Sequence, residues 1–280
     1  MDIAKLAGPR SCVNISVNTV EILTLMEKKI DPPRPARSDS DVPGPVRLHG
    51  IQGGVVSLGL RQNARGLPGG GVVMKLLDLF CGAGGAAMGY YRAGFKDITG
   101  IDNQPMPRYP FNFIQADALE YLEERGHEYD VIHASPPCQR YSIITPIAHK
   151  GKHPDLIEPI RTLLIKTGKP YVIENVPGAR HLLINPIKLC GTMFRLNLWR
   201  HRFFEVNPWK SQLIMCCNHS SLPVLITGTC RKPQGRFENT AQECREASGL
   251  YWMTRKEMDE AIPPAYTEWL GKRILEALNA

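Results

Sequence analysis

The sequence predicts an α/β fold with a doubly wound, mostly parallel sheet. From Lys75 onward, short apolar runs with strand character alternate with Gly-rich turns and amphipathic helical segments, and this alternation is typical of strands joined by crossover helices. In such sheets, ligands bind at the carboxyl ends of the strands. The predicted strands are residues 75–80, 97–102, 129–137 and 170–176, and the predicted helices are residues 84–95, 118–126, 156–168 and 267–278.

The composition fits one or two globular domains. With 280 residues, of which 43% are hydrophobic, the chain can bury a sizeable core. No apolar run is long enough for a membrane span, and we expect a cytoplasmic protein without membrane contact. The net charge of +7 weakly favours a polyanionic partner. Eight cysteines without an export signal indicate reduced thiols with structural, catalytic or metal-binding roles.

Composition also divides the chain into four parts. Residues 1–73 are rich in Pro, Gly, Arg and Ser and are expected to form a disordered or loosely packed extension, with Met74 as an alternative translation start. Residues 74–206 carry the alternating pattern and form the expected main domain. Residues 207–259 are irregular and contain Cys, Gly and Arg, and residues 260–280 are expected to form a helix that returns to the main domain.

A glycine-rich turn follows the first predicted strand, in Asp78-Leu79-Phe80-Cys81-Gly82-Ala83-Gly84-Gly85. Glycines at such a turn let the backbone approach a ligand closely before a helix begins. The spacing differs from G-x-G-x-x-G and lacks the G-K-[ST] of a phosphate loop, so it argues against hydride and phosphoryl transfer. It favours a small cofactor without a pyrophosphate, although many nucleotide-binding proteins carry a similar turn.

Two aspartates stand near the ends of the following strands. Asp102 closes the second strand, where a carboxylate can accept hydrogen bonds from ribose hydroxyls. Asp117 lies near the next strand end and can bond an adenine amino group. Taken singly, each is more often a helix N-cap or a solvated loop residue. Their order after the glycine turn favours a nucleoside site.

Two further strand ends carry reactive side chains. Ser135-Pro136-Pro137-Cys138-Gln139 is a rigid diproline turn that fixes where the Cys138 thiol points, whereas Cys12 and Cys190 are interpreted as buried apolar residues. Glu174 emerges from an apolar strand, so partial burial is expected to raise its pKa and to let it share a proton near neutral pH. The alternative is an acid simply exposed at a strand end.

Two arginines, Arg200 and Arg202, lead into an apolar segment. In an extended chain their i, i+2 spacing places both guanidinium groups on one face, which suits recognition of an anion or a carbonyl oxygen. The alternative for this pair is a solvated edge strand.

In chain order, DLFCGAGG, the acidic end of the second strand, SPPCQ, ENV and RHR resemble the motif series of the DNA cytosine-C5 methyltransferase family. The resemblance runs from about Leu76 to Arg202 and returns weakly near the C-terminus, and the compact chain is similar to small members from bacteriophages and prophages. It implies a class I S-adenosylmethionine-dependent methyltransferase fold, with residues 74–206 as the catalytic and cofactor-binding domain and residues 207–259 as a short target-recognition segment. It also implies S-adenosylmethionine as cofactor, and we expect a monomeric enzyme that acts on double-stranded DNA.

The same resemblance implies a role for each motif. Cys138 attacks C6 of cytosine, Glu174 stabilises protonation at N3, and Arg202 bonds O2. Carbon 5 then takes the methyl group and loses its proton, and elimination of Cys138 restores the ring. The thiolate of Cys138 is the attacking species, so the site is expected to favour it electrostatically. Arg200 is also expected among the catalytic residues, where it would anchor a phosphate or a loop. The implied cofactor-binding residues are Asp78, Phe80, Cys81, Gly82, Ala83, Gly84, Gly85, Asp102, Asp117 and Pro136.

Because C5 and C6 are stacked inside duplex DNA, the target base is expected to flip into the pocket. The loop 139–152 is long enough to close over it, and lysines there supply phosphate contacts that weaken with salt. Base readout is expected from residues 207–259, whose arginines do not reveal a target sequence. The implied DNA-binding residues are Gln139, Ser142, Lys150, Lys152, Arg231, Lys232 and Arg236.

The chain departs from the family pattern in three places. Ser135 replaces a usual glycine, Leu198 replaces a usual glutamine, and residues 259–264 lack the asparagine that helps to close the cofactor pocket. Two alternatives stay open: a related transferase acting on tRNA cytosine, which usually carries a Cys-Phe-Thr element not found here, and a non-catalytic DNA-binding relative.

The irregular segment also holds residues of metal-ligand type. They lack a C-x-x-C pair, so no metal site is expected. These residues are Cys216, Cys217, His219, Cys230 and Cys244.

Overall fold

The computed structural model describes residues 73–143, 145–208, 216–220, 223–226, 230–232, 235–237 and 239–279. The extension expected over residues 1–73 therefore lies outside the described residues, apart from Val73. Among the described residues, every helix is too short or too polar to span a membrane.

A seven-stranded mixed sheet with the order β3-β2-β1-β4-β5-β7-β6 forms the centre of the fold. The strands β1 to β5 run parallel, and β7 is antiparallel to both of its neighbours. The expected doubly wound, mostly parallel sheet is confirmed. The strands are β1 (Lys75–Leu79), β2 (Asp97–Asp102), β3 (Asn112–Gln115), β4 (Val131–Ala134), β5 (Tyr171–Asn175), β6 (Ile187–Leu189) and β7 (Arg202–Asn207).

The chain reverses its direction of travel across the sheet between β1 and β4. It moves outward from β1 through β2 to β3, then returns to β4 on the other side of β1. The carboxyl ends of β1 and β4 therefore flank a topological switch point, which is where ligands bind in sheets of this kind.

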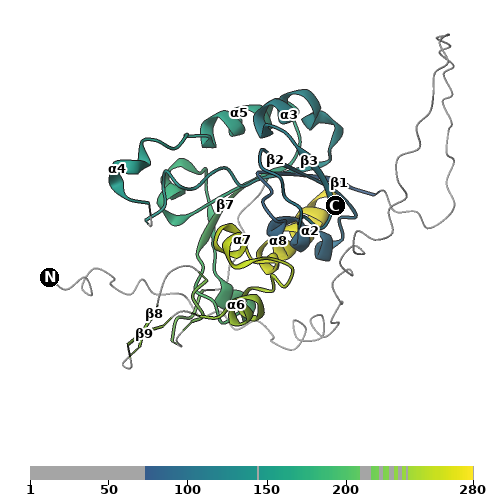
Figure 1. The fold of residues 1–280 in the computed structure, drawn as a ribbon. Helices are drawn as coiled ribbons and strands as arrows, with labels where there is room; N and C mark the ends of the chain where they lie inside the picture. Colours follow the sequence, from purple (N-terminus) through teal and green to yellow (C-terminus); the bar gives the residue numbers. More distant parts are fainter. Residues whose placement is uncertain are drawn as a thin grey trace, which may run out of the picture. The chain divides into compact units, whose positions relative to one another are not determined.

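Helices cover both faces of the sheet, as Figure 1 shows for α3 and α5 on one side and α2 and α8 on the other. Successive residues of a strand point to opposite faces, and Leu76 accordingly joins the core under α2 and α8 while Leu77 joins the core under α3 and α5. The helices are α2 (Gly85–Ala93), α3 (Ala118–Arg125), α4 (Ile147–Lys150), α5 (Ile157–Thr167), α6 (Ala241–Ser248), α7 (Arg255–Glu260) and α8 (Pro264–Leu278), with 3-10 turns η2 (Gly126–Glu128), η3 (Pro177–Leu182) and η4 (Gly191–Phe194).

The last helix packs closely on the helix that follows the glycine turn. A Cβ at Gly89 would collide with Thr267 Oγ1 and the Pro264 carbonyl, so only glycine allows this approach. Thr267 Oγ1 donates to the Ala86 carbonyl at 2.8 Å. Specific contacts therefore hold α8 against α2.

A buried ion pair ties α5 to β7. Arg161 donates from Nε and Nη2 to the two carboxylate oxygens of Glu205 at 2.8 and 2.7 Å, and both side chains are at most 4% exposed. The Tyr171 hydroxyl at 3.2 Å and the Ile184 amide at 2.8 Å also donate to Glu205. Because every charged oxygen has a partner, the pair is a satisfied network that fixes this side of the sheet.

The irregular segment contains more regular structure than expected. A two-stranded hairpin joins β8 (Cys230–Lys232) and β9 (Gly235–Phe237), and α6 and α7 follow it. Each of these helices begins with a capping box, Thr240 with Glu243 and Thr254 with Glu257. The Thr-x-x-Glu pattern is a sequence signal for a helix start, so both helices could have been predicted.

Candidate active site

A cavity of about 720 Å³ opens at the carboxyl ends of β1, β2, β4 and β5. It lies at the switch point of the sheet, where the sequence places its candidate residues. Residues of the glycine turn, two aspartates, the diproline turn, Glu174 and Arg202 share this one lining. The predicted residues among the lining are Asp78, Phe80, Cys81, Gly82, Ala83, Gly85, Asp102, Asp117, Pro136, Cys138, Gln139, Glu174 and Arg202.

The glycine turn is held in left-handed backbone conformations. Gly82 and Gly84 have φ values of 49° and 84°, and Phe80 also has a positive φ of 55°. A Cβ at Gly84 would lie 2.6 Å from Pro110 Cδ, whereas one at Gly82 would meet nothing within 4 Å. Gly82 therefore borders open space in the cavity, while Gly84, which lies outside the lining, shapes the turn.

Both aspartates accept backbone hydrogen bonds at the rim of the cavity. Asp102 accepts from the Gly82 amide at 3.1 Å and from the Gln104 amide at 3.0 Å, so it braces the glycine turn. Asp117 is the N-cap of α3 and also lines the cavity. Asp117 is therefore both a helix N-cap, as the alternative interpretation had it, and a residue of the cavity lining.

Asp78 is the most deeply buried acid of the cavity. Its side chain is fully buried, and Oδ2 accepts from the Tyr109 hydroxyl at 3.2 Å. Burial raises its pKa well above the usual range, although the hydrogen bond from Tyr109 opposes the shift. Oδ1 has no close hydrogen-bond partner among the described residues. A buried carboxyl oxygen without a partner is costly, so this wall of the cavity can accept a donor or a cation from a ligand.

Cys138 is held by hydrogen bonds on both sides of the diproline turn. The Asn175 side-chain amide donates to the Pro136 carbonyl at 3.0 Å, which ties the end of β5 to the turn. The amides of Tyr141 and Ser142 donate to the Cys138 carbonyl at 3.0 and 2.9 Å. Cys138 is half-buried at the cavity wall.

Glu174 and Arg202 form an ion pair beside this thiol. Arg202 Nε lies 2.9 Å from Glu174 Oε1. Burial raises the pKa of Glu174, while Arg202, a hydrogen bond from Ser135 and Arg200 pull it down. The expected elevation of the pKa is present, and Glu174 is buried and ion-paired, so the alternative of an exposed acid at a strand end is wrong.

The pKa of the Cys138 thiol is raised in this arrangement. Burial is the largest cause and the charge of Glu174 adds to it, whereas Arg202 and Arg200 lower the pKa. In this structure the site does not favour the thiolate as expected, because desolvation raises the pKa of Cys138 by more than the two arginines lower it. Neutralising Glu174 would remove one of the two causes that raise the pKa of Cys138.

Ser135, which departs from the family pattern, belongs to a chain of hydrogen bonds behind Glu174. Tyr90 Oη lies 3.0 Å from His133 Nδ1, and His133 Nε2 lies 2.9 Å from Ser135 Oγ. Burial lowers the pKa of His133 to about 3, so the imidazole is neutral. The serine hydroxyl thus links a buried neutral histidine to the carboxylate.

Arg200 occupies a different environment from Arg202. It is 8% exposed and lies outside the cavity lining. Its Nη2 donates to the Asp259 carbonyl at 2.6 Å, and its own carbonyl accepts from the Tyr266 hydroxyl at 2.5 Å. Burial, followed by repulsion from Arg202, lowers its pKa to about 9. Because Arg202 begins β7, which lies between β5 and β6, and because Arg200 is buried, the alternative of a solvated edge strand is wrong for this pair.

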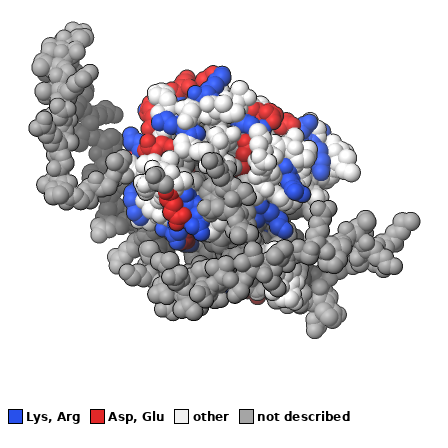
Figure 2. All heavy atoms as spheres, turned by 180° about the vertical axis from the view of Figure 1, so that it is seen from behind, with Lys and Arg blue, Asp and Glu red and all other residues white. Residues whose placement is uncertain are grey.

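The candidate DNA-binding residues lie in two places. Gln139 lines the cavity, and Ser142, Lys150 and Lys152 lie on the neighbouring loop and at α4. Arg231, Lys232 and Arg236 lie on the β8–β9 hairpin, and their side chains are outside the described residues. Figure 2 shows Lys and Arg interspersed with Asp and Glu on the face it presents, so charge alone does not mark an anion-binding surface there.

Part of the cavity wall comes from residues that were not predicted as site residues. Glu257, Glu260, Ala261 and Ile262 line the side where the usual asparagine is missing. Trp252 Nε1 donates to the Ala83 carbonyl at 2.8 Å and so ties the segment before α7 to the glycine turn. The sequence feature from which this wall could have been predicted is the triplet Ile262-Pro263-Pro264.

The central segment of the chain matches a known protein family. Residues 74–183 match the C-5 cytosine-specific DNA methylase family. The family resemblance is confirmed for this methylase segment, which spans β1 to η3 and includes Cys138 and Glu174. Arg202 and the rest of the site lie beyond it.

The related proteins are type II methyltransferases and match over short stretches. M.FnuDI of Fusobacterium nucleatum is 41% identical over 115 residues, which are 38% of this chain and 33% of the relative. M.HgiDII of Herpetosiphon aurantiacus is 30% identical over 125 residues, 39% of this chain and 34% of the relative. M.XorII of Xanthomonas oryzae is 29% identical over 118 residues, 36% and 28% of the two chains. The chain thus spans about a third of the length of these relatives.

Two solved structures share the fold of the methylase segment and its surroundings. The Dnmt2 methyltransferase of S. pombe aligns with a TM-score of 0.51 at 13% identity, covering 74% of this chain and 99% of that one. The Entamoeba histolytica methyltransferase EhMeth aligns with a TM-score of 0.51 at 13% identity, covering 73% and 98%. At this level of identity the likeness concerns the fold, and it agrees with the predicted methyltransferase architecture.

Proposed function

We propose that this protein transfers a methyl group from S-adenosylmethionine to C5 of cytosine in double-stranded DNA. The observation that carries the proposal is the meeting of three groups in one cavity: the thiol of Cys138, the ion pair of Glu174 and Arg202, and the glycine turn after β1. The match of residues 74–183 to the cytosine-C5 methylase family supports it.

The cofactor side of the cavity fits S-adenosylmethionine. Among the described residues, Asp78 Oδ1 has no close hydrogen-bond partner, and a cationic amino acid group would supply one. Gly82 leaves space for a ligand to approach the backbone, Asp102 borders it with a carboxylate, and Phe80 offers an aromatic ring. When bound, S-adenosylmethionine supplies an electrophilic methyl group on a sulfonium centre.

The opposite side of the cavity is suited to activating cytosine, whose C5 is a poor nucleophile. We propose that Cys138 Sγ adds to C6, that Glu174 stabilises a proton at N3, and that Arg202 donates to O2. The addition makes C5 nucleophilic, and after methylation, loss of the C5 proton and expulsion of Cys138 restore the aromatic ring. A proton shared between Glu174 and N3 weakens the negative charge that raises the pKa of Cys138, so base binding itself favours the attacking thiolate.

Access to the base requires that it leaves the duplex, because C5 and C6 are covered by stacking. We propose that the loop 139–152 closes over the flipped base, with Lys150 and Lys152 at phosphates. Arg231, Lys232 and Arg236 on the β8–β9 hairpin are proposed DNA contacts. Arg200, which is buried and hydrogen-bonded to Asp259 of α7 and Tyr266 of α8, is proposed as a positioning residue for Arg202 instead of a phosphate ligand.

A covalent trap tests this proposal. Duplex DNA synthesised with 5-fluorocytosine in every cytosine position offers all sequence contexts, and fluorine at C5 blocks the final elimination. With S-adenosylmethionine present, the wild-type chain is expected to form a denaturation-resistant adduct, and Cys138→Ser is not. The proposal would be contradicted if the folded wild-type chain formed the adduct with tRNA that carries 5-fluorocytosine, or if it formed no adduct with either tRNA or duplex DNA.

A further inference from the structure

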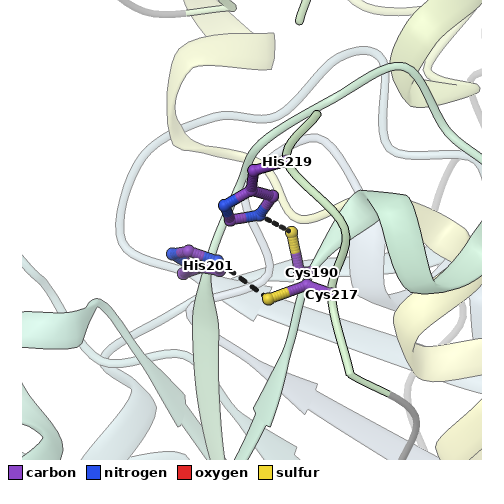
Figure 3. A group of neighbouring side chains, drawn as sticks. All are labelled: Cys190, His201, Cys217 and His219. Carbon is purple, nitrogen blue, oxygen red and sulfur yellow. Dashed lines mark hydrogen bonds between the residues drawn. The ribbon is translucent and has the colours of Figure 1, made fainter. Parts of the chain in front are cut away.

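Four residues of metal-ligand type gather on the sheet edge away from the cavity lining, and we call them the Cys2His2 cluster. They are Cys190, His201, Cys217 and His219. Their four donor atoms all lie within 4.8 Å of one another. Figure 3 shows the two sulfur atoms and the two imidazole rings facing a common centre.

Strand pairing brings the first two members together. In the antiparallel ladder of β6 and β7, Leu189 is opposite Arg202. The next residue along each strand is Cys190 on one side and His201 on the other, so the register itself makes them neighbours. Cys190 and His201 thus stand directly beyond the last paired residues of β6 and β7.

The second half comes from the segment 216–220. Cys217 and His219 are two residues apart, a spacing that puts both side chains on one side of an extended chain. The Asn218 amide between them donates to Thr192 Oγ1 at 3.2 Å. The His219 ring stacks on Trp199, with centroids 4.6 Å apart and planes inclined by 27°. Packing and a hydrogen bond therefore direct this pair toward the first.

Two of the ligand–ligand distances agree with a tetrahedral metal centre. His219 Nε2 lies 3.3 Å from Cys190 Sγ, and His201 Nε2 lies 3.7 Å from Cys217 Sγ. Ligands that each lie about 2.0–2.3 Å from a tetrahedral zinc ion are separated from one another by roughly 3.3–3.8 Å. We propose that the Cys2His2 cluster binds one structural Zn²⁺ ion.

The choice of zinc follows from the donor set. Two thiolates and two neutral imidazoles balance the charge of a divalent ion, and tetrahedral S2N2 sites are characteristic of zinc. Four protein ligands leave no open position, so the site is structural and takes no part in methyl transfer. The competing interpretation is a pair of weak S–H···N hydrogen bonds, which the same distances would allow.

The position of the cluster suggests what the ion would do. His201 stands between Arg200 and Arg202 in the chain, and Cys217 belongs to the segment 216–220. A bound ion would fix the start of β7, from which Arg202 reaches Glu174, and would fasten the segment 216–220 to the sheet. This inference does not depend on the proposed function, because metal content and methyl transfer are measured separately.

Metal analysis of the full chain tests the proposal. Protein purified without chelators or a metal-binding tag, from cells grown with added zinc, is expected to carry one zinc ion per chain by mass spectrometry of the elements. The variants Cys217→Ser and His219→Gln are expected to lose the metal. Cys216→Ser is the matched control, because Cys216 is the exposed neighbour outside the cluster, and this variant is expected to keep it.

Cobalt substitution gives a readout that does not depend on variants folding. Co²⁺ added to the metal-free full chain is expected to produce the intense visible bands of tetrahedral coordination together with sulfur-to-cobalt charge transfer. A folded chain that carries no zinc and gives no such bands would overturn the proposal. Equal zinc in Cys217→Ser and Cys216→Ser would overturn it as well, since the metal would then lie elsewhere.

Discussion

Arg202 Nε lies 2.9 Å from Glu174 Oε1, with the two side chains 11% and 9% exposed. The pair joins two antiparallel neighbours, β5 and β7. Glu174 belongs to the segment 74–183 that matches the cytosine-C5 methylase family, whereas Arg202 lies beyond it. The proposed activating group for the base is therefore completed by a part of the chain outside the matched segment.

Replacing Arg202 by Gln is expected to lower the methyl-transfer rate by about 10²–10³-fold. Arg202 lowers the pKa of both Glu174 and Cys138, so its loss raises both and removes the proposed donor to O2. Arg202→Lys retains the charge without the planar fork and is expected to recover part of the rate. Single-turnover transfer of a labelled methyl group measures the effect, and an unchanged rate in Arg202→Gln would exclude the proposed role.

Replacing Ser135 by Gly, the usual family residue, is expected to shift the pH dependence of the rate. The hydrogen bond from Ser135 lowers the pKa of Glu174, so its removal raises that pKa. The limb of the pH–rate profile that reports Glu174 then moves to higher pH, because a higher pKa keeps the acid protonated further up the scale. Single-turnover rates across a pH series would reveal the shift, and a limb that stays in place or moves down would contradict this assignment.

Replacing Asp78 by Asn is expected to stabilise the ligand-free protein while weakening cofactor binding. Burial raises the folded-state pKa of Asp78 above its unfolded value, so the folded state binds more protons and the wild type loses stability as pH rises above about 4. The variant lacks this loss, so its advantage should grow with pH to roughly 1–3 kcal/mol.

Thermal unfolding at several pH values, with and without S-adenosylmethionine, measures both parts of the Asp78→Asn prediction. The variant should melt higher than the wild type at pH 7 without ligand and gain less from the ligand. Equal advantages at pH 4 and pH 7 would show that the ionisation of Asp78 is not the cause.

Replacing Glu205 by Ala is expected to destabilise the protein by about 3–5 kcal/mol, because Arg161 would remain buried without its partner. Glu158 is the matched control: it also contacts Arg161, but its side chain is 69% exposed. Removing Glu158 should cost less than about 1 kcal/mol. Denaturant unfolding of the two variants compares them directly, and equal losses would argue against a buried network as the source of stability.

Much of the fold could be predicted because its signals are local. The apolar runs at β1, β2, β4 and β5 and the helical patterns at α2, α3, α5 and α8 match the structure. The strands β3 and β6 have four and three residues, too few for a periodic pattern to emerge. The helices α6 and α7 carried a usable capping signal that the irregular composition around them obscured.

The two candidate sites differ in how far the sequence reveals them. Cys138 and Glu174 stand directly at strand ends, so a parallel sheet brings them to one cavity once the strands are known. The partnership of Cys190 with His201 depends on the register of β6, a strand that was not predicted, and Cys190 was interpreted as a buried apolar residue. Sequence patterns for zinc sites rely on ligands that are close in the chain, such as C-x-x-C. Here, by contrast, the pairing of β6 with β7 brings Cys190 and His201 together.

The most direct test of the central claim is to express the chain in cells that lack cytosine methylation and to map 5-methylcytosine across their DNA. We expect a recurrent short sequence carrying 5-methylcytosine with the wild-type chain, and none with Cys138→Ala produced at the same level. Equal modification by both chains, or none by a folded and soluble wild type that binds S-adenosylmethionine, would contradict the central claim.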